Sequence, residues 1–209
     1  MSTRFVLTVA LLAWATTSWA EDLRFRWALG AVTGAARDRH YVAVTEDVVL
    51  HTGDEIKMFV SPSCTCFIYV VHEDPLGAVT VLFPSNGSFS ERGTAGGSRH
   101  YIPADSAWLR LDSTTGLERI YLVASSKRLL DFERLLTRPP SRSADKTLIR
   151  DVVAEIARLQ KQAGNRKWSE RPIAMAGQIR GDHPDVAQDA REWTGDSSFF
   201  SRVVVIDHR

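Results

Sequence analysis

Hydrophobic and polar residues alternate near the start of the chain. From Leu23 to Leu29 every second residue is large and apolar, and the residues between them are Arg24, Arg26 and Ala28. A period of two is typical of a strand with one buried face. The pattern predicts a β-strand over residues 23–29.

Shorter β-rich runs follow, separated by turn-forming residues. They cover residues 41–44, 48–50, 55–60, 66–73, 78–83, 101–103, 107–111 and 118–124. Between two of these runs, Asp74-Pro75-Leu76-Gly77 has proline and glycine at the second and fourth positions of a β-turn, which predicts a hairpin. Short strands at this spacing indicate an antiparallel sandwich or an open barrel.

The pattern changes to a helical period after residue 126. A short helix is expected over residues 131–136, and a long one over residues 144–163, with Ser143 as N-cap and Gly164 as C-terminal stop. The long helix has one apolar stripe, formed by Leu148, Ile149, Val152, Val153, Ile156 and Leu159. A single stripe packs on one surface, most simply a face of the β domain. After a polar stretch at 177–196, residues 199–206 predict a final strand.

The predicted fold is therefore mainly β (α+β): a sandwich or open barrel with a long amphipathic helix packed on it and a C-terminal strand. We expect a β-rich domain over residues 21–136 and a helix-plus-strand segment over residues 137–209, packed on the same domain.

Residues 1–20 have the order of charge, apolar core and small residues found in secretory signals. Arg4 precedes an apolar run from Phe5 to Ala15, and the segment ends in Ser18-Trp19-Ala20. A membrane-spanning helix needs about 20 apolar residues, which is longer than this run. The pattern predicts a signal peptide cleaved after Ala20. The new first residue would be Glu21, which does not fit the lipoprotein route, and no stable membrane span would remain.

Composition narrows the class of partner. Residues 1–20 contain one Arg and no acid, so the 26 Lys and Arg of the whole chain become 25 after cleavage, equal to its 25 Asp and Glu. Proteins that bind nucleic acid usually concentrate basic residues on one face. No such concentration is present, which argues against a nucleic-acid partner.

The two cysteines, Cys64 and Cys66, are separated by one residue. In a straight strand their Cα atoms would lie about 6.5–7 Å apart, at the upper edge of disulfide geometry. A disulfide would need a bent backbone, which Ser61-Pro62-Ser63 could supply. A Cys64–Cys66 disulfide, two buried unpaired thiols, and a metal or redox pair are the alternatives, and the buried unpaired thiols are favoured.

His72 has the same strand parity as the cysteines but cannot join them on one metal. At about 3.3 Å per residue it lies roughly 20 Å beyond Cys66, whereas zinc ligands lie about 2.0–2.3 Å from the metal. His51 or His100 from other strands could complete a metal site, but a structural role for the cysteines is favoured.

Other chemical patterns have simpler structural interpretations. His72-Glu73-Asp74 could perform acid–base chemistry, but a solvated turn capped by Asp74 is favoured. Gly93–Gly97 is interpreted as a flexible loop, 86–88 and 180–182 as turns, and 207–209 as a solvated tail. No catalytic, cofactor-binding or metal-binding residue is assigned.

A set of strand and turn residues lies between Leu50 and Ser126: Gly53-Asp54, Cys64 to Val70, Asp74, Gly77, Val79, Leu82-Phe83-Pro84, Tyr101-Ile102-Pro103, Gly116, Glu118-Arg119 and Leu122 to Ser125. In these residues the segment resembles the bacterial domain of unknown function 4384 (DUF4384). It implies an accessory or sensing role in the cell envelope and no catalytic residues to carry over. The family pattern does not require both cysteines.

The sequence thus predicts an exported, periplasmic or secreted protein that acts as a non-catalytic binding or assembly module of the bacterial cell envelope. Its expected partner is another envelope protein, and no cofactor is expected. The alternative is a small exported hydrolase whose site is not recognisable from sequence.

Overall fold

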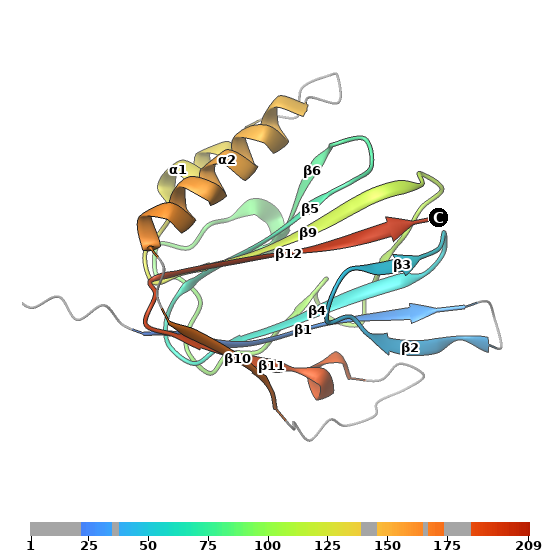
Figure 1. Cartoon of the computed structure of the whole chain (residues 1–209), viewed down its shortest axis with the longest axis horizontal. Coiled ribbons are helices and arrows are strands. Elements are labelled where there is room, and N and C mark those ends of the chain that lie inside the picture. Colours follow the sequence, from blue (N-terminus) through green and yellow to red (C-terminus); the bar gives the residue numbers. More distant parts are fainter. Residues whose placement is uncertain (1–21, 35–37, 139–145, 165–166, 174–184) are drawn as a thin grey trace, which may run out of the picture.

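Two β-sheets packed face to face form the body of the protein in the computed structural model (Figure 1). The structure describes residues 22–34, 38–138, 146–164, 167–173 and 185–209. The expected signal peptide, the Ser143 cap and the tripeptide 180–182 lie outside these residues.

The first sheet has the strand order β10-β11-β1-β4-β7, and β2 and β8 add to β1 and β4. All of its pairings are antiparallel. Its strands are β1 (Leu23–Thr33), β2 (His40–Ala43), β4 (Glu55–Pro62), β7 (His100–Ile102), β8 (Leu109–Arg110), β10 (Trp168–Pro172) and β11 (Arg191–Gly195).

The second sheet has the order β3-β12-β9-β5-β6. Its strands are β3 (Val48–Leu50), β5 (Phe67–Glu73), β6 (Val79–Phe83), β9 (Gly116–Ser125) and β12 (Phe199–His208). They pair antiparallel, except that β12 runs parallel to β3. The prediction of a mainly β protein with a final C-terminal strand is confirmed, and the two sheets do not close into a barrel.

The main hydrophobic core lies between the sheets. Alternate residues of β1 point into it, as the period of two predicts, and they meet Ile68 and Val70 of β5 and Ile120 and Leu122 of β9. Trp193 of β11 stacks on Phe25 with ring centroids 5.6 Å apart. This inner core determines which side chains of each strand face the other sheet.

Two helices, α1 (Leu130–Leu136) and α2 (Lys146–Ala163), cover the outer face of the second sheet (Figure 1). A second core forms beneath them, in which Ile149, Val152 and Ile156 of α2 are buried. Val153, expected in the same stripe, is instead 43% exposed. The predicted long helix and its docking on the β domain are confirmed.

The short helix η3 (Val186–Asp189) covers the outer face of the first sheet, and η2 (Ser85–Gly87) follows β6. Neither β10 nor β11 was expected. Both are short, and charged residues interrupt their hydrophobic pattern. No helix in the described part of the chain is long and apolar enough to cross a membrane.

Candidate functional site

Three polar side chains meet on the inner face of the second sheet, at the end where the main core stops. Glu118 of β9 lies between His72 of β5 and His208 of β12. One carboxylate oxygen is 2.7 Å from His72 Nε2, and the other is 2.7 Å from His208 Nδ1. Glu118 and His208 are both buried. We call these residues the His–Glu–His cluster.

Thr52 extends this cluster by one hydroxyl group. Its Oγ1 lies 3.1 Å from His208 Nε2, which gives the order hydroxyl, imidazole, carboxylate. That order is also found in catalytic triads. Here, however, the backbone N–H groups of Thr52, Gly53 and Asp54 all donate to backbone carbonyls. These amides are therefore not free to stabilise an oxyanion.

The neighbouring residues His72 and Glu73 point to opposite faces of the second sheet. Glu73 points to the outer face of the sheet, where it accepts a hydrogen bond from Tyr121 Oη at 2.7 Å and pairs with Arg119 at 3.2 Å. Asp74 caps the turn through its side chain, as expected. His72 is not a solvated turn residue, because it faces inward to Glu118.

Sequence reasoning missed Glu118 and His208. The interpretation of residues 207–209 as a solvated tail was wrong for His208, which belongs to β12 and is buried. The available signal was the alternation of Val204, Ile206 and His208, which continues the inward-facing row to the end of the strand.

Both cysteines are free thiols in the structure, but Cys64 is only partly buried, unlike the buried pair that was expected. Cys66 is fully buried, and burial raises the pKa of its thiol to about 12. Its backbone pairs with Thr94, and a Cβ on Gly93 would lie 2.8 Å from the Cys66 carbonyl oxygen. The glycine-containing loop is therefore paired with Cys66, in the connection between β4 and β5.

The two other histidines considered as metal ligands have different surroundings. His51 lies 4.0 Å from Asp54, and His100 bonds Ser98 at 2.8 Å and packs against Phe83. Within the described ranges, no group of three or more His, Cys, Asp and Glu side chains is placed to hold a metal ion.

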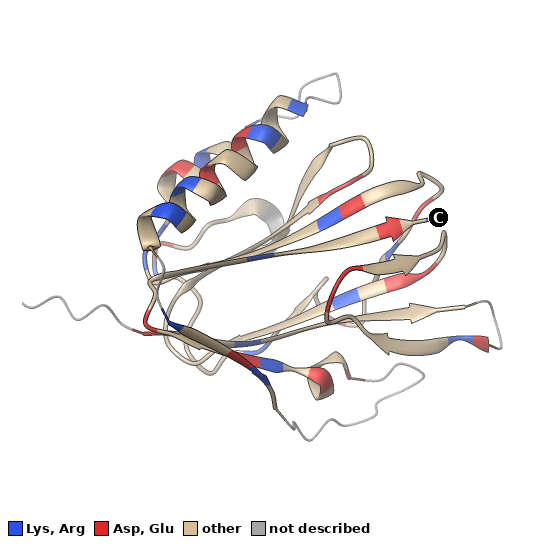
Figure 2. Cartoon of the chain, viewed as in Figure 1, with Lys and Arg blue, Asp and Glu red and all other residues tan. Residues whose placement is uncertain are grey.

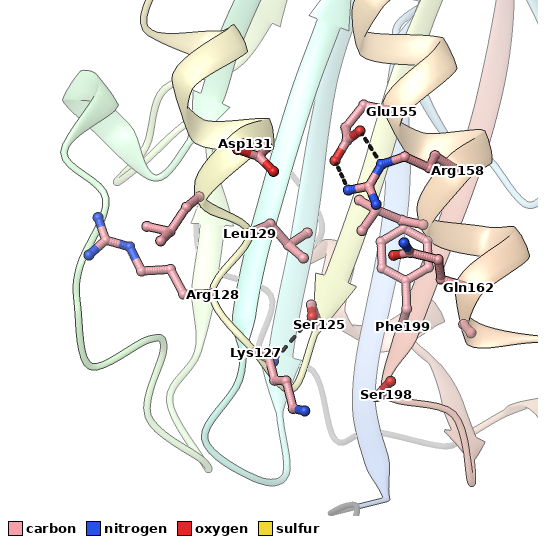
Figure 3. Close-up of a pocket in the computed structure, with 13 residues that line it drawn as sticks. Ser125, Lys127, Arg128, Leu129, Asp131, Glu155, Arg158, Gln162, Ser198 and Phe199 are labelled. Carbon is pink, nitrogen blue, oxygen red and sulfur yellow. Dashed lines mark hydrogen bonds and ion pairs between the residues drawn. The ribbon is translucent and has the colours of Figure 1, made fainter.

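A groove of about 380 Å³ opens where α1 and α2 meet the ends of β9 and β12 (Figure 3). We call it the helix groove. Its apolar part is formed by Leu129, Leu159 and Phe199, and Leu130 stands at its edge, 51% exposed. The ring of Phe199 lies beside α2 in Figure 3.

Charged side chains surround this apolar part. Glu155 and Arg158 of α2 form a two-pronged ion pair on one side (Figure 3). Lys127 and Asp131 come from the connection into α1 and from α1 itself. Acidic and basic residues are also mixed along α2 as a whole (Figure 2). The helix groove thus has an apolar centre and a rim that carries both signs of charge.

The connection into α1 is fixed by a buried carboxylate. Glu133 accepts hydrogen bonds from Arg128 Nε at 2.8 Å and from Tyr69 Oη at 2.8 Å. The backbone N–H of Leu129 in turn donates to Tyr69 Oη at 3.3 Å. These contacts tie one wall of the helix groove to β5, so the groove is formed by packed structure on both sides.

The central part of the chain matches a known family model. Residues 49–128 match the model of a domain of unknown function, DUF4384. The resemblance expected from the sequence is thereby confirmed. Comparisons with curated proteins and with solved structures find no match.

The DUF4384 segment contains β4 to β9 and most of β3, and it ends just before α1. It supplies His72 and Glu118, but His208 comes from outside it. The helix groove likewise lies where the DUF4384 segment meets α1, α2 and β12. β12 therefore completes the His–Glu–His cluster, and α1, α2 and β12 complete the helix groove.

Proposed function

We propose that this protein is an exported, non-catalytic binding or assembly module of the bacterial cell envelope, and that another envelope protein binds in the helix groove. The observation that carries the proposal is the apolar centre of this groove with its rim of mixed charge. The proposal of export rests on the signal-like pattern of residues 1–20.

The chemistry of the groove favours a protein partner. The central parts of protein interfaces are apolar and their rims are polar. The exposed Leu130 side chain beside Leu129 and Phe199 offers an apolar anchor, while Lys127 and Arg158 offer charged contacts at the rim. A partner segment with an apolar residue flanked by polar ones would fit this arrangement.

The test compares two equally exposed leucines. Leu130 lies in the helix groove, and Leu76, which is 56% exposed, lies in the β5–β6 turn. Full-length protein with a C-terminal tag would be expressed in its native host, cross-linked and recovered with its partners. We expect Leu130→Asp to lose a specific partner that the wild type and Leu76→Asp retain, because the new charge would be buried against apolar surface.

Equal recovery of partners by Leu130→Asp and Leu76→Asp would contradict the assignment of the helix groove. Recovery of the protein only from the cytoplasm, with residues 1–20 still attached, would contradict export.

A second candidate function rests on the order Thr52, His208, Glu118. If this were a hydrolytic site, Thr52→Val would abolish hydrolysis of an activated ester such as p-nitrophenyl acetate. We expect instead that wild type and Thr52→Val hydrolyse this ester at the same slow rate, because the nearby backbone amides are engaged.

A further inference from the structure

A second groove, of about 480 Å³, opens between the two sheets beside the C-terminal end of α2. We call it the strand groove. Its walls come from β10 and β11 of the first sheet and from β12 of the second, which lie near the end of α2 in Figure 1. The side chains used below are Gln160, Trp168, Glu170, Ser201 and Arg202.

Trp168 forms an aromatic platform in this groove. Its side chain is 64% exposed, more than any other large hydrophobic residue in the described part of the chain. The backbone at Trp168 is held in place, because β10 pairs with β11 in register and places Trp168 opposite Gly195. A Cβ on Gly195 would lie 2.7 Å from the Trp193 ring and 3.2 Å from Trp168 Cβ, so the absent side chain allows both tryptophans to pack there.

The other groups of the strand groove are polar and pre-arranged. Gln160 Nε2 donates to Ser201 Oγ at 2.7 Å. The amide oxygen of the Gln160 side chain and the hydroxyl hydrogen of Ser201 are then left for a ligand. Arg202 donates to Glu170 at 2.8 Å, and its guanidinium lies 5.0 Å from the ring centroid of Trp27. A second N–H group, on Arg202 Nη2, donates to the Thr45 carbonyl oxygen at 2.9 Å. These contacts hold the guanidinium in one orientation, and its remaining N–H groups can donate to a ligand.

Charge and size restrict the ligand. Among the described residues that line the groove, the charged ones are Glu170 and Arg202, which form an ion pair with each other. A groove of this volume is in the range of small-molecule sites. A small, neutral ligand with many hydroxyl groups fits these conditions.

We propose that the strand groove binds a pyranose ring of a neutral oligosaccharide. A pyranose has one apolar C–H face, which would lie on the indole of Trp168, and a rim of hydroxyls that both donate and accept hydrogen bonds. Gln160 and Ser201 supply an acceptor and a donor for that rim, and Arg202 supplies charge-assisted donors.

The experiment titrates the mature protein with chitotriose, cellotriose and maltotriose and follows the tryptophan indole N–H signals by NMR. We expect at least one trisaccharide to bind with a dissociation constant on the order of 1 mM, typical of a single shallow subsite. Trp168→Ala should weaken that binding by more than about tenfold, and Trp168→Phe by less, because a smaller ring retains part of the platform. Leu76→Ala is the control and should leave binding unchanged.

Gln160→Ala provides an independent variant, because the residue lies on the surface of α2 and its loss should weaken binding without altering the platform. Absence of binding by all three trisaccharides at about 10 mM would overturn the proposal, as would equal binding by wild type and Trp168→Ala. Loss of a protein partner from Trp168→Ala, with no trisaccharide bound, would also overturn it and assign the groove to a protein. None of these variants alters Leu130, so this test and that of the helix groove can fail separately.

Discussion

Replacing Glu118 by Gln tests whether the His–Glu–His cluster stabilises the fold. The substitution keeps the size and shape of the side chain but removes its charge and replaces one oxygen by an NH₂ group. Glu118 now accepts hydrogen bonds from both His72 and His208, at 2.7 Å each. In the variant, one imidazole N–H would face a second donor unless that ring changed its tautomer.

The expected loss follows from the two bonds. A hydrogen bond to a charged group contributes about 1.5–3 kcal/mol and a neutral one about 0.5–1.5 kcal/mol, so loss of the charge costs about 2 kcal/mol over both bonds. A buried donor left facing another donor adds about 1–3 kcal/mol. We therefore expect Glu118→Gln to lower the free energy of unfolding by about 3–5 kcal/mol, or by about 2 kcal/mol if that ring changes its tautomer.

Urea unfolding monitored by circular dichroism measures this difference. The matched control is Glu91→Gln, because the Glu91 side chain is 90% exposed and forms a surface ion pair with Arg128 at 3.8 Å. A surface pair of this kind contributes about 0–1 kcal/mol. If the two variants lost the same stability within about 0.5 kcal/mol, the assigned role of the cluster would be wrong.

Three further results are expected. Ile156→Ala should lower the free energy of unfolding, measured by thermal unfolding, by about 2–5 kcal/mol, because Ile156 is buried. Val153 lies on the same helix but is exposed, so Val153→Ala should change this free energy by less than about 0.5 kcal/mol. Burial lowers the pKa of His100 below its ordinary 6.5. Just below pH 6.5 the unfolded chain therefore binds a proton that the folded chain does not, so wild type should lose more stability than His100→Gln between pH 7 and pH 5. Iodoacetamide at about pH 8 should alkylate Cys64 in the folded protein and Cys66 only after unfolding, because burial raises the pKa of the Cys66 thiol. If neither cysteine were modified unless a reductant was added, a disulfide would be indicated.

Local pattern was sufficient to predict the elements whose residues repeat regularly. The stripe on α2 has a helical period, and the β5–β6 turn has proline and glycine at the favoured positions, so both were identified from sequence. The strands β10 and β11 were missed because charged residues such as Glu170 and Glu192 occupy inward or edge positions. Salt bridges make these charges tolerable there: Arg202 pairs with Glu170, and Arg171 pairs with Glu192. Such pairing is visible only once the strands are adjacent.

The candidate sites depend on contacts between residues far apart in sequence. Glu118 and His208 are 90 positions apart and meet only because β9 and β12 are neighbours. Lys57 gives a second example: its Nζ donates to the carbonyl oxygens of Asp105 and Ala107 at 2.6 and 2.7 Å. Alternation along β4 indicates which way Lys57 points but not which loop covers it.

The position of β12 has a consequence for the timing of folding. The last strand of the chain lies between β3 and β9, inside the second sheet, so that sheet is divided until the final residues are available. Contacts that join distant parts of a chain form slowly, because a long loop must close before they are gained. β3 therefore joins the rest of this sheet only after β12 has paired with β9, which makes the β3–β12 pairing a late step of folding.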